Sequence, residues 1–263
     1  LFRGCANGCR FCQAGFIYRP VRERSPDTVV AICRSLLLST GYDELSLNSL
    51  STGDYSGLKE IVTRLKPFVK ERGVKLSLPS LRMDSFDGET ADTERKSSLT
   101  FAPEAGTQRL RDVINKNITE ENIFNTLAQA FERGYSSVKF YFMLGLPTET
   151  DEDVLGIADV AARVMHAWRE SAPNKQRGVR ITVSTSWFVP KPHTAFQWEP
   201  QISKQEYERR VALLREAIKT RTVTYNWHDS DTSFLEAVLA RGDRRLGKVL
   251  ETAWRKGAKL DAW

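Results

Sequence analysis

The sequence has no long apolar run. No window of about 18 or more consecutive apolar residues occurs in its 263 residues, so we expect no membrane-spanning helix. It also has only four cysteines and no amino-terminal stretch with the apolar core of a secretion signal. Sparse cysteines without such a signal are typical of a reducing compartment, and the predicted location is the cytoplasm.

Histidines and extended basic runs are scarce as well. The three histidines are scattered (His166, His193 and His228), and we assign none of them a catalytic role. The formal net charge is +6. The short basic clusters at 19–24 and 241–245 are as typical of a solvated face as of phosphate contact. This balance permits an anionic partner such as RNA without requiring one.

Three of the four cysteines lie within eight residues, as Cys5, Cys9 and Cys12 at a Cys-x3-Cys-x2-Cys spacing. Thiolates this close can converge on one inorganic centre, and Gly4 and Gly8 would supply the positive backbone angles of a tight loop. Three ligands leave one iron of a four-iron cluster open to another molecule. Structural zinc usually has four ligands in two pairs, and this run has no second pair. The pattern therefore favours an iron–sulfur cluster, with zinc as the alternative.

The fourth cysteine lies in a different setting. Cys33 is in line with Val29, Ile32, Leu36 and Leu37 at helical spacing. This pattern predicts a small residue in the core rather than a metal ligand.

The cysteine run resembles the loop of the radical S-adenosylmethionine (radical SAM) superfamily, in which an aromatic residue precedes the last cysteine, as Phe11 does here. The resemblance implies a [4Fe-4S] cluster on Cys5, Cys9 and Cys12, with SAM chelating the open iron. One electron would then split SAM into methionine and a 5′-deoxyadenosyl radical, and a reductant such as flavodoxin or ferredoxin would supply that electron. We expect Phe11 to pack on the adenine and to shield the cluster from water.

Strand and helix patterns alternate along most of the chain, which predicts right-handed βαβ units and a parallel sheet. The expected fold class is α/β, a partial parallel (β/α)6 barrel of the radical SAM type. The barrel would occupy residues 1–200, with its first strand reduced to 1–3, and a C-terminal α/β extension at 201–263 would pack on it as an accessory layer. The further predicted strands are 44–50, 74–81, 98–102, 138–144, 180–186 and 222–227, and the predicted helices are 25–39, 56–72, 107–115, 119–133, 150–172, 203–220, 231–240 and 243–256. The interval 84–96 is expected to hold a short helix or loop.

The chemistry of such folds lies at the carboxyl ends of the strands. There, Ser51-Thr52-Gly53-Asp54 resembles the family's Gly-Gly-Glu element, which binds the methionine amino group of SAM. Asp54 stands in place of the usual glutamate, and Ser51 and Thr52 precede the single Gly53. A plain strand-to-helix turn is the alternative interpretation.

Two later strand ends carry similar resemblances. Pro103-Glu104-Ala105-Gly106 resembles a segment that approaches the ribose or methionine part of SAM in related proteins. Glu104 could accept hydrogen bonds from SAM, or it could be a carboxylate at a helix start. Residues 145–150 (Gly-Leu-Pro-Thr-Glu-Thr) resemble the fifth-strand element that flanks the adenine. Gly145 would allow close approach there, and Glu149 is predicted to be an acid of the first helical turn.

Four segments resemble the branch of the superfamily that often carries an amino-terminal cobalamin-binding domain and is related to the methylthiotransferases: 103–107, 145–150, 188–194 and 240–246. Cobalamin would be held by a domain outside this chain. We expect a radical SAM enzyme that acts on an unidentified substrate, with no catalytic residue assigned. A methylthio- or methyltransferase acting on RNA or a ribosomal protein is a narrower alternative. A non-catalytic, metal-stabilised binding module is the alternative of another class.

Overall fold

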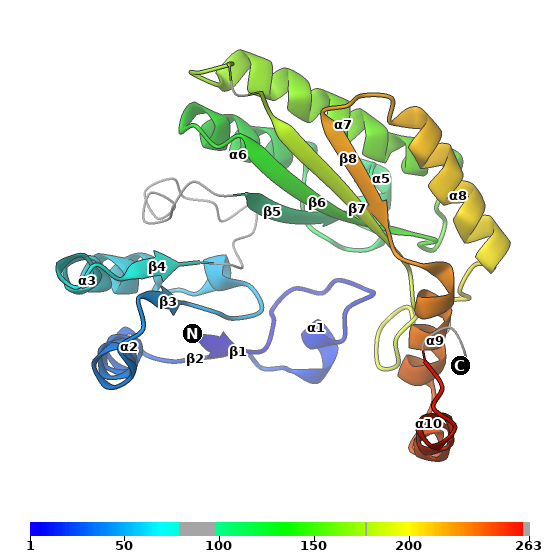
Figure 1. Cartoon of the computed structure of the whole chain (residues 1–263), viewed down its shortest axis with the longest axis horizontal. Coiled ribbons are helices and arrows are strands. Elements are labelled where there is room, and N and C mark those ends of the chain that lie inside the picture. Colours follow the sequence, from blue (N-terminus) through cyan, green and yellow to red (C-terminus); the bar gives the residue numbers. More distant parts are fainter. Residues whose placement is uncertain (79–97, 177, 260–263) are drawn as a thin grey trace.

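The structure is a computed structural model that describes residues 1–78, 98–176 and 178–259 (Figure 1). Helices and strands alternate through most of these residues. In chain order, the described elements are β1 (Phe2–Arg3), α1 (Ala14–Ile17), β2 (Arg22–Glu23), α2 (Pro26–Thr40), β3 (Glu44–Ser46), the 3-10 helix η1 (Thr52–Asp54), α3 (Leu58–Glu71), β4 (Lys75–Ser77), β5 (Leu99–Glu104), α5 (Gln108–Val113), α6 (Glu120–Glu132), β6 (Ser137–Leu144), α7 (Asp151–Ser171), β7 (Arg180–Trp187), α8 (Lys204–Ala217), β8 (Val223–Trp227), α9 (Ser230–Arg241) and α10 (Leu246–Arg255).

The largest sheet holds β5, β6, β7 and β8 in that order, and all three strand pairs are parallel. Helices α6, α7 and α8 cover one of its faces (Figure 1). Side chains alternate between the two faces of a strand. In β6, Val138, Phe140 and Phe142 are therefore buried in the main core, whereas Lys139 and Tyr141 on the other face are not. This arrangement confirms the predicted α/β class and parallel sheet.

A second core lies in the amino-terminal part, where α2 and α3 pack with the parallel pair β3 and β4. Helix α2 begins where the sequence predicts, because the Ser25 hydroxyl accepts a hydrogen bond from the Thr28 N–H at 3.3 Å. It ends at Gly41, which has a φ of +71°. Ile61 and Leu65 of α3 are completely buried in this core. The two cores are the framework on which the cysteine loop is held.

The first strand differs from its prediction. β1 pairs antiparallel with β2 rather than joining a parallel sheet, and the Leu1 amino group donates to the Asn48 carbonyl at 3.1 Å. The predicted strand 44–50 is shorter, because the chain turns into η1 after β3. Of the strand predicted at 74–81, only β4 is seen, and residues 79–81 lie outside the described residues, as does the interval 84–96.

The C-terminal part also departs from the sequence-based expectation. β8 pairs with β7 and extends the main sheet, so it is not a strand of a separate layer. Its alternation is hard to distinguish in sequence from that of an accessory strand. Ser203 caps α8 as predicted, but the Glu206 side chain does not complete a capping box; it pairs with Arg209 and Arg210 at 2.8 and 2.7 Å. The boundary at residue 200 stays a prediction.

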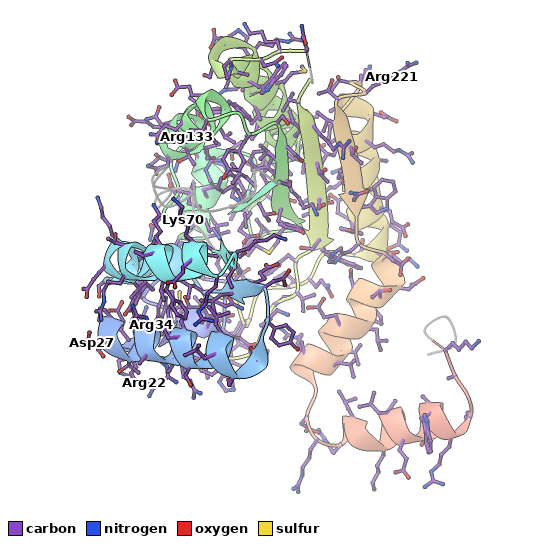
Figure 2. The ribbon with its side chains drawn as sticks, turned by 60° about the vertical axis from the view of Figure 1, so that its left-hand side comes forward. Arg22, Asp27, Arg34, Lys70, Arg133 and Arg221 are labelled. Carbon is purple, nitrogen blue, oxygen red and sulfur yellow. The ribbon has the colours of Figure 1, made fainter. Side chains whose placement is uncertain are left out.

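Helices α9 and α10 extend away from the sheet (Figures 1 and 2). α10 has no buried residue, and its Trp254 is 75% exposed. Within the three described ranges, none of the helices is both long enough and apolar enough to cross a bilayer.

Candidate cofactor site at the cysteine loop

The cysteine loop lies at the carboxyl end of the main sheet and is fixed there by backbone hydrogen bonds. The N–H of Arg10 donates to the Ile114 carbonyl at 2.9 Å, and the N–H of Phe196 donates to the Arg10 carbonyl at 3.1 Å. The Asn115 side chain donates to the Gly8 carbonyl at 2.9 Å. Segments more than 100 residues downstream therefore set the conformation of the loop.

The loop glycines have two different roles. Gly4 has a φ of +94°, as expected, and a side chain there would approach the Tyr18 carbonyl to 2.3 Å. Gly8 does not have a positive φ, so that prediction was wrong. A Cβ at position 8 would lie 3.0 Å from the Asn115 side chain. At Gly8 the close approach of the Asn115 side chain, not the backbone angle, favours a residue without a side chain.

The three loop thiols are available as ligands. All four cysteines are described, and none forms a disulfide. Cys9 is buried, while Cys5 and Cys12 are partly exposed. Among the described residues, no three His, Cys, Asp or Glu side chains converge closely enough to hold a single metal ion. Thiolates that bind separate irons of a cluster do not need to meet at one point.

Cys33 lies in a different environment from the three loop cysteines. It is 5% exposed and belongs to the core between α2, α3 and β3. Burial raises the pKa of its thiol, which opposes formation of the thiolate that binds metal. Its predicted place in the core is what the structure shows.

Asp54 lies beside the cysteine loop. The Asn7 amide donates to the Asp54 carboxylate at 3.1 Å and contacts the Cys5 sulfur at 3.6 Å. Asn7 therefore joins the first cysteine to an acid 47 residues away. Sequence reasoning did not single out Asn7, and its place between two cysteines was the only available signal.

The rest of the Ser51–Asp54 element forms η1 and its N-cap. Thr52 is fully buried and its hydroxyl donates to the Leu47 carbonyl at 3.3 Å. Gly53 is partly exposed at the centre of η1. The Ser51 hydroxyl is buried with no hydrogen-bond partner in the described residues. A buried hydroxyl without a partner is costly, and a bound polar ligand would relieve that cost.

Glu104 and Phe11 meet through a lysine. Glu104 ends β5 with a φ of +69°, an uncommon value for a residue with a side chain. Its carboxylate pairs with the Lys116 ammonium at 3.1 Å, and this ammonium lies 5.8 Å from the centre of the Phe11 ring. Burial raises the pKa of Glu104, and the lysine opposes that rise. Glu104 precedes the N-cap of α5, Thr107, so it does not lie in the first helical turn.

The backbone angle and the packing at position 145 both require glycine. Its φ is +87°, and a Cβ there would approach the Ile202 side chain to 2.8 Å. Its N–H donates to the Glu149 carboxylate at 2.7 Å. Glu149 precedes the N-cap Thr150, so it is not an acid of the first turn of α7 as predicted; it is buried and paired with Arg210. A contact between Gly145 and the adenine stays a prediction.

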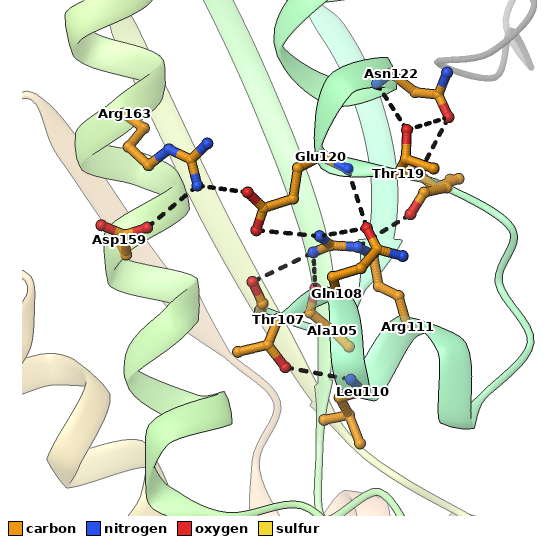
Figure 3. A network of polar contacts seen from close by, with 12 residues as sticks. Ala105, Thr107, Gln108, Leu110, Arg111, Thr119, Glu120, Asn122, Asp159 and Arg163 are labelled. Carbon is orange, nitrogen blue, oxygen red and sulfur yellow. Dashed lines mark hydrogen bonds and ion pairs between the residues drawn. The ribbon is translucent and has the colours of Figure 1, made fainter.

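Arg111 is a buried residue that sequence reasoning missed. Its guanidinium has no exposed surface and donates to the carbonyls of Ala105 and Ile118 at 3.1 Å each (Figure 3). It also reaches Gln108 at 3.3 Å and Glu120 at 3.5 Å. This network fixes the turn after β5, directly beyond Glu104. A charged residue in a short helix gives no sequence signal of burial, and the apolar neighbour Leu110 alone would not predict it.

The aromatic crossing segment 188–199 touches both the loop and α9. The Gln13 side chain donates to the Pro192 carbonyl at 3.0 Å. On the other side, one nitrogen of Arg241 donates to the carbonyls of Pro190 and Gln197 at 3.1 and 3.0 Å. These contacts give Arg241, within the segment 240–246, a structural role.

The residues present fit a cluster with one open iron. The donor set is three thiols on one glycine-containing loop, with a carboxylate and an unpartnered buried hydroxyl nearby. Thiolates suit iron–sulfur clusters, and a carboxylate suits the amino group of SAM. Asn7 links Cys5 to Asp54, and Lys116 links Glu104 to Phe11, the residue before Cys12.

Comparisons with known proteins identify relatives. A profile of the family described as Radical SAM superfamily matches residues 1–161. The chain is 32% identical over 250 residues to an uncharacterized protein of Methanocaldococcus jannaschii, covering 95% of this chain and 52% of that protein. It is 25% identical over 177 residues to the ribosomal protein uS12 methylthiotransferase RimO of Treponema denticola, covering 57% of this chain and 38% of the relative. It is 25% identical over 172 residues to the tRNA-2-methylthio-N(6)-dimethylallyladenosine synthase of Acetivibrio thermocellus, covering 61% and 36%. The chain spans about half or less of the length of these relatives.

Two solved structures share the fold. The radical SAM methyltransferase TsrM from Kitasatospora setae, solved with cobalamin and a [4Fe-4S] cluster, matches with a TM-score of 0.54 and 18% identity, covering 74% of this chain and 37% of that chain. HydG, a maturase of the [FeFe]-hydrogenase, matches with a TM-score of 0.52 and 15% identity, covering 92% and 54%. At these identities the likeness is one of fold.

Proposed function

Since this chain belongs to the radical SAM superfamily, we propose that it is the catalytic core of an enzyme that binds a [4Fe-4S] cluster through Cys5, Cys9 and Cys12. Held by these cysteines, the cluster would supply the one-electron chemistry that cleaves SAM to methionine and a 5′-deoxyadenosyl radical, which would abstract hydrogen from a substrate. A soluble reductant such as flavodoxin or ferredoxin provides that electron.

The chain's own residues position the cofactor. Asp54 would accept a hydrogen bond from the methionine amino group of SAM, and the Ser51 hydroxyl would gain a polar partner. Glu104 would contact the ribose or amino group, and Gly145 and Phe11 would flank the adenine. The pair of Glu104 with Lys116 keeps the carboxylate oriented, because its charged partner lies 3.1 Å away.

The observation that carries this proposal is the position of Asn7. Its amide contacts the Cys5 sulfur and the Asp54 carboxylate at once. A molecule bound to a cluster on this loop would therefore have an acid within reach. A plain strand-to-helix turn gives no reason for Asp54 to lie against the cysteine loop.

The decisive experiment is anaerobic reconstitution with iron and sulfide. We expect a visible charge-transfer absorbance and deoxyadenosine formation from SAM in the presence of a strong reductant, and both should disappear when all three loop cysteines are replaced by alanine. Zinc has a filled d shell and is colourless. A colourless, iron-free protein, or an iron-loaded protein that never cleaves SAM, would contradict the proposal and favour a binding module.

A second candidate is a methylthio- or methyltransferase that acts on RNA or a ribosomal protein. Two relatives at 25% identity bear the names of methylthiotransferases, one for ribosomal protein uS12 and one for a tRNA adenosine. The net charge of +6 is compatible with an RNA substrate. Mass spectrometry of tRNA and ribosomal proteins from cells that lack the gene would test this candidate, and an unchanged set of methyl and methylthio groups would contradict it.

Cobalamin would belong to the whole protein rather than to this chain. A structural neighbour of the same fold was solved with cobalamin. We propose that cobalamin, if the reaction uses it, is held by a domain outside these 263 residues. Cobalamin binding by the full-length protein but not by this chain would support that assignment.

A further inference from the structure

The amino ends of β6, β7 and β8 form a polar pocket of about 500 Å³. It lies at the end of the sheet opposite to the cysteine loop. Figure 2 shows Arg221 at this end of β8, with α9 and α10 beyond the other end. The residues that matter among its lining are Ser137, Arg180, Arg221, Thr222 and Thr224.

The strand residues of this pocket share the face of the sheet that the helices leave uncovered. Ser137 pairs with Arg180, and two residues further on, Lys139 pairs with Thr182, which pairs with Thr224. Because side chains alternate along a strand, these five lie on one face. The residues between them are buried in the main core: Val138, Ile181 and Val223.

The two arginines that line the pocket, and Lys139 beside it, have no acidic partners among the described residues. Within the described residues, the side chains of Lys139, Arg180 and Arg221 form no hydrogen bond or ion pair. The described lining of the pocket contains no acidic residue. On the helices of the other face, by contrast, Arg209 of α8 is paired with Asp151 of α7 at 2.7 Å. Two arginines among hydroxyls, with no counter-charge, form a surface suited to an oxyanion.

We propose that this pocket binds a phosphate group of a ligand. The forked guanidinium groups of Arg180 and Arg221 match phosphate oxygens, and the hydroxyls of Thr222 and Thr224 add short donors. Lys139 continues the positive charge along the sheet. The phosphate belongs either to a nucleic-acid strand or to a small phosphate ester, because both present the same oxygens.

The distance from the pocket to the cysteine loop distinguishes what these two ligands could do. From Arg180 to Trp187 the strand rises about 23 Å, at about 3.3 Å per residue. A small ester in the pocket does not reach the cysteine loop and acts away from the reaction. An extended strand spans the distance, so its bound phosphate places another part of the molecule near the loop.

The test is a binding titration with the iron-loaded protein. The probes are inorganic phosphate, uridine monophosphate and a single-stranded oligouridylate. We expect the double variant Arg180→Gln with Arg221→Gln to bind the tightest of these probes at least tenfold more weakly. Lys139→Gln should show a smaller loss, and Lys70→Gln, the same charge change on the distant helix α3, should bind within twofold of the unaltered protein. Equal binding by the double variant, or no binding of any probe to the unaltered protein, would overturn the inference.

The dependence on salt identifies the source of the phosphate. If the oligouridylate binds more tightly than the monophosphate, the slope of log K against log salt should fall by about 1.4 in the double variant, from about 0.7 per lost phosphate contact. Tighter binding of the monophosphate would assign the pocket to a small ester. Either result supports a phosphate site.

Iron content and deoxyadenosine formation, measured on the same samples, test the proposed enzyme activity independently of the phosphate site. Iron content and deoxyadenosine formation should be unchanged in the double variant, because both arginines are exposed and lie at the far end of the sheet. An unaltered protein without iron would contradict the enzyme proposal and leave the pocket intact. An iron-loaded protein that binds no phosphate probe would contradict the phosphate site and leave the enzyme proposal intact.

Discussion

At the scale of single residues, Asp54 is the position where a substitution should separate SAM binding from cluster assembly. Asp54→Ala removes a carboxylate from the cofactor site but leaves the thiols of the loop in place. Losing a hydrogen bond to a charged group costs about 1.5–3 kcal/mol, so we expect SAM to bind about tenfold or more weakly, with unchanged iron content. Equilibrium dialysis with labelled SAM measures this. Asp54→Glu keeps the carboxylate and is the control; equal affinity in the alanine variant would remove Asp54 from the site.

For Cys33 we expect a substitution to affect stability but not cofactor binding. Cys33→Ala should retain all the iron, because the thiol is buried in the α2–α3 core and its pKa is raised by burial. The free energy of unfolding should fall by about 1 kcal/mol, as for an ordinary core truncation. Iron analysis and urea denaturation check both points. Iron loss in this variant, matching that of Cys9→Ala, would make Cys33 a ligand.

The residue scale also shows what the sequence could reveal. Cys5, Cys9 and Cys12 carry a chemical signature in their spacing alone, and Gly4 follows from the backbone of a tight loop. Arg111 has no such signature, because its burial depends on carbonyls that converge only after folding.

At the scale of elements, Arg111 holds the turn after β5. Replacing it with methionine should cost about 3–5 kcal/mol, because the carbonyls of Ala105 and Ile118 and the carboxylate of Glu120 all lose a donor in or near the core. Thermal or urea unfolding measures the loss. Arg163→Met removes the exposed partner of the same Glu120 and should cost under about 1 kcal/mol. Equal costs for the two variants would contradict the buried network.

Glu149 joins the turn after β6 to α8. Burial raises the pKa of this carboxyl to about 7, although the Gly145 N–H and Arg210 favour its charged form. A folded pKa above the unfolded value of 4.5 means that its contribution to stability is full below about pH 4.5 and is lost as the pH rises through about 7. Over that range the free energy of unfolding should fall by up to about 3 kcal/mol.

The Glu149→Gln variant should lack that fall. Urea unfolding of both proteins at a series of pH values provides the comparison, and parallel pH profiles would show that Glu149 titrates normally. Glu149 contacts Gly145 and also Arg210, which is 61 residues later in the chain. The sequence showed only that Glu149 lies near a helix start, so its role could not be predicted from it.

Strands and helices were predictable to different degrees. Buried residues alternate in β6 and β7 over eight residues each, which is enough to identify both strands in the sequence. β3 and β4 are three residues each, and their ends are set by turns and neighbours. The membership of β8 in the main sheet depends on its pairing with β7, which no local pattern encodes.

At the scale of the whole molecule, the cysteine loop bridges two separate cores. Asn7 contacts Asp54 beside the α2–α3 core, and Gly8 and Arg10 contact the segment after α5 beside the main sheet. A cluster on this loop should therefore stabilise both parts, since a ligand that binds only the folded state adds about 4 kcal/mol at a thousandfold excess over its Kd.

Removing the iron with a chelator tests this coupling. We expect a lower Tm and faster amide hydrogen exchange in both α3 and α5 than in the iron-loaded protein. The variant with all three loop cysteines replaced should not respond to the chelator. Faster exchange confined to the loop itself would show that the two cores are independent of it.

The contacts of Arg241 have a consequence for handling the protein in air. This side chain holds the aromatic segment at Pro190 and Gln197, and the same segment borders the cysteine loop through Pro192 and Phe196. Loss of the two hydrogen bonds from Arg241 would loosen this segment and open a route for dioxygen toward the cysteine sulfurs. Arg241→Ala should therefore bleach faster in air than the unaltered iron-loaded protein.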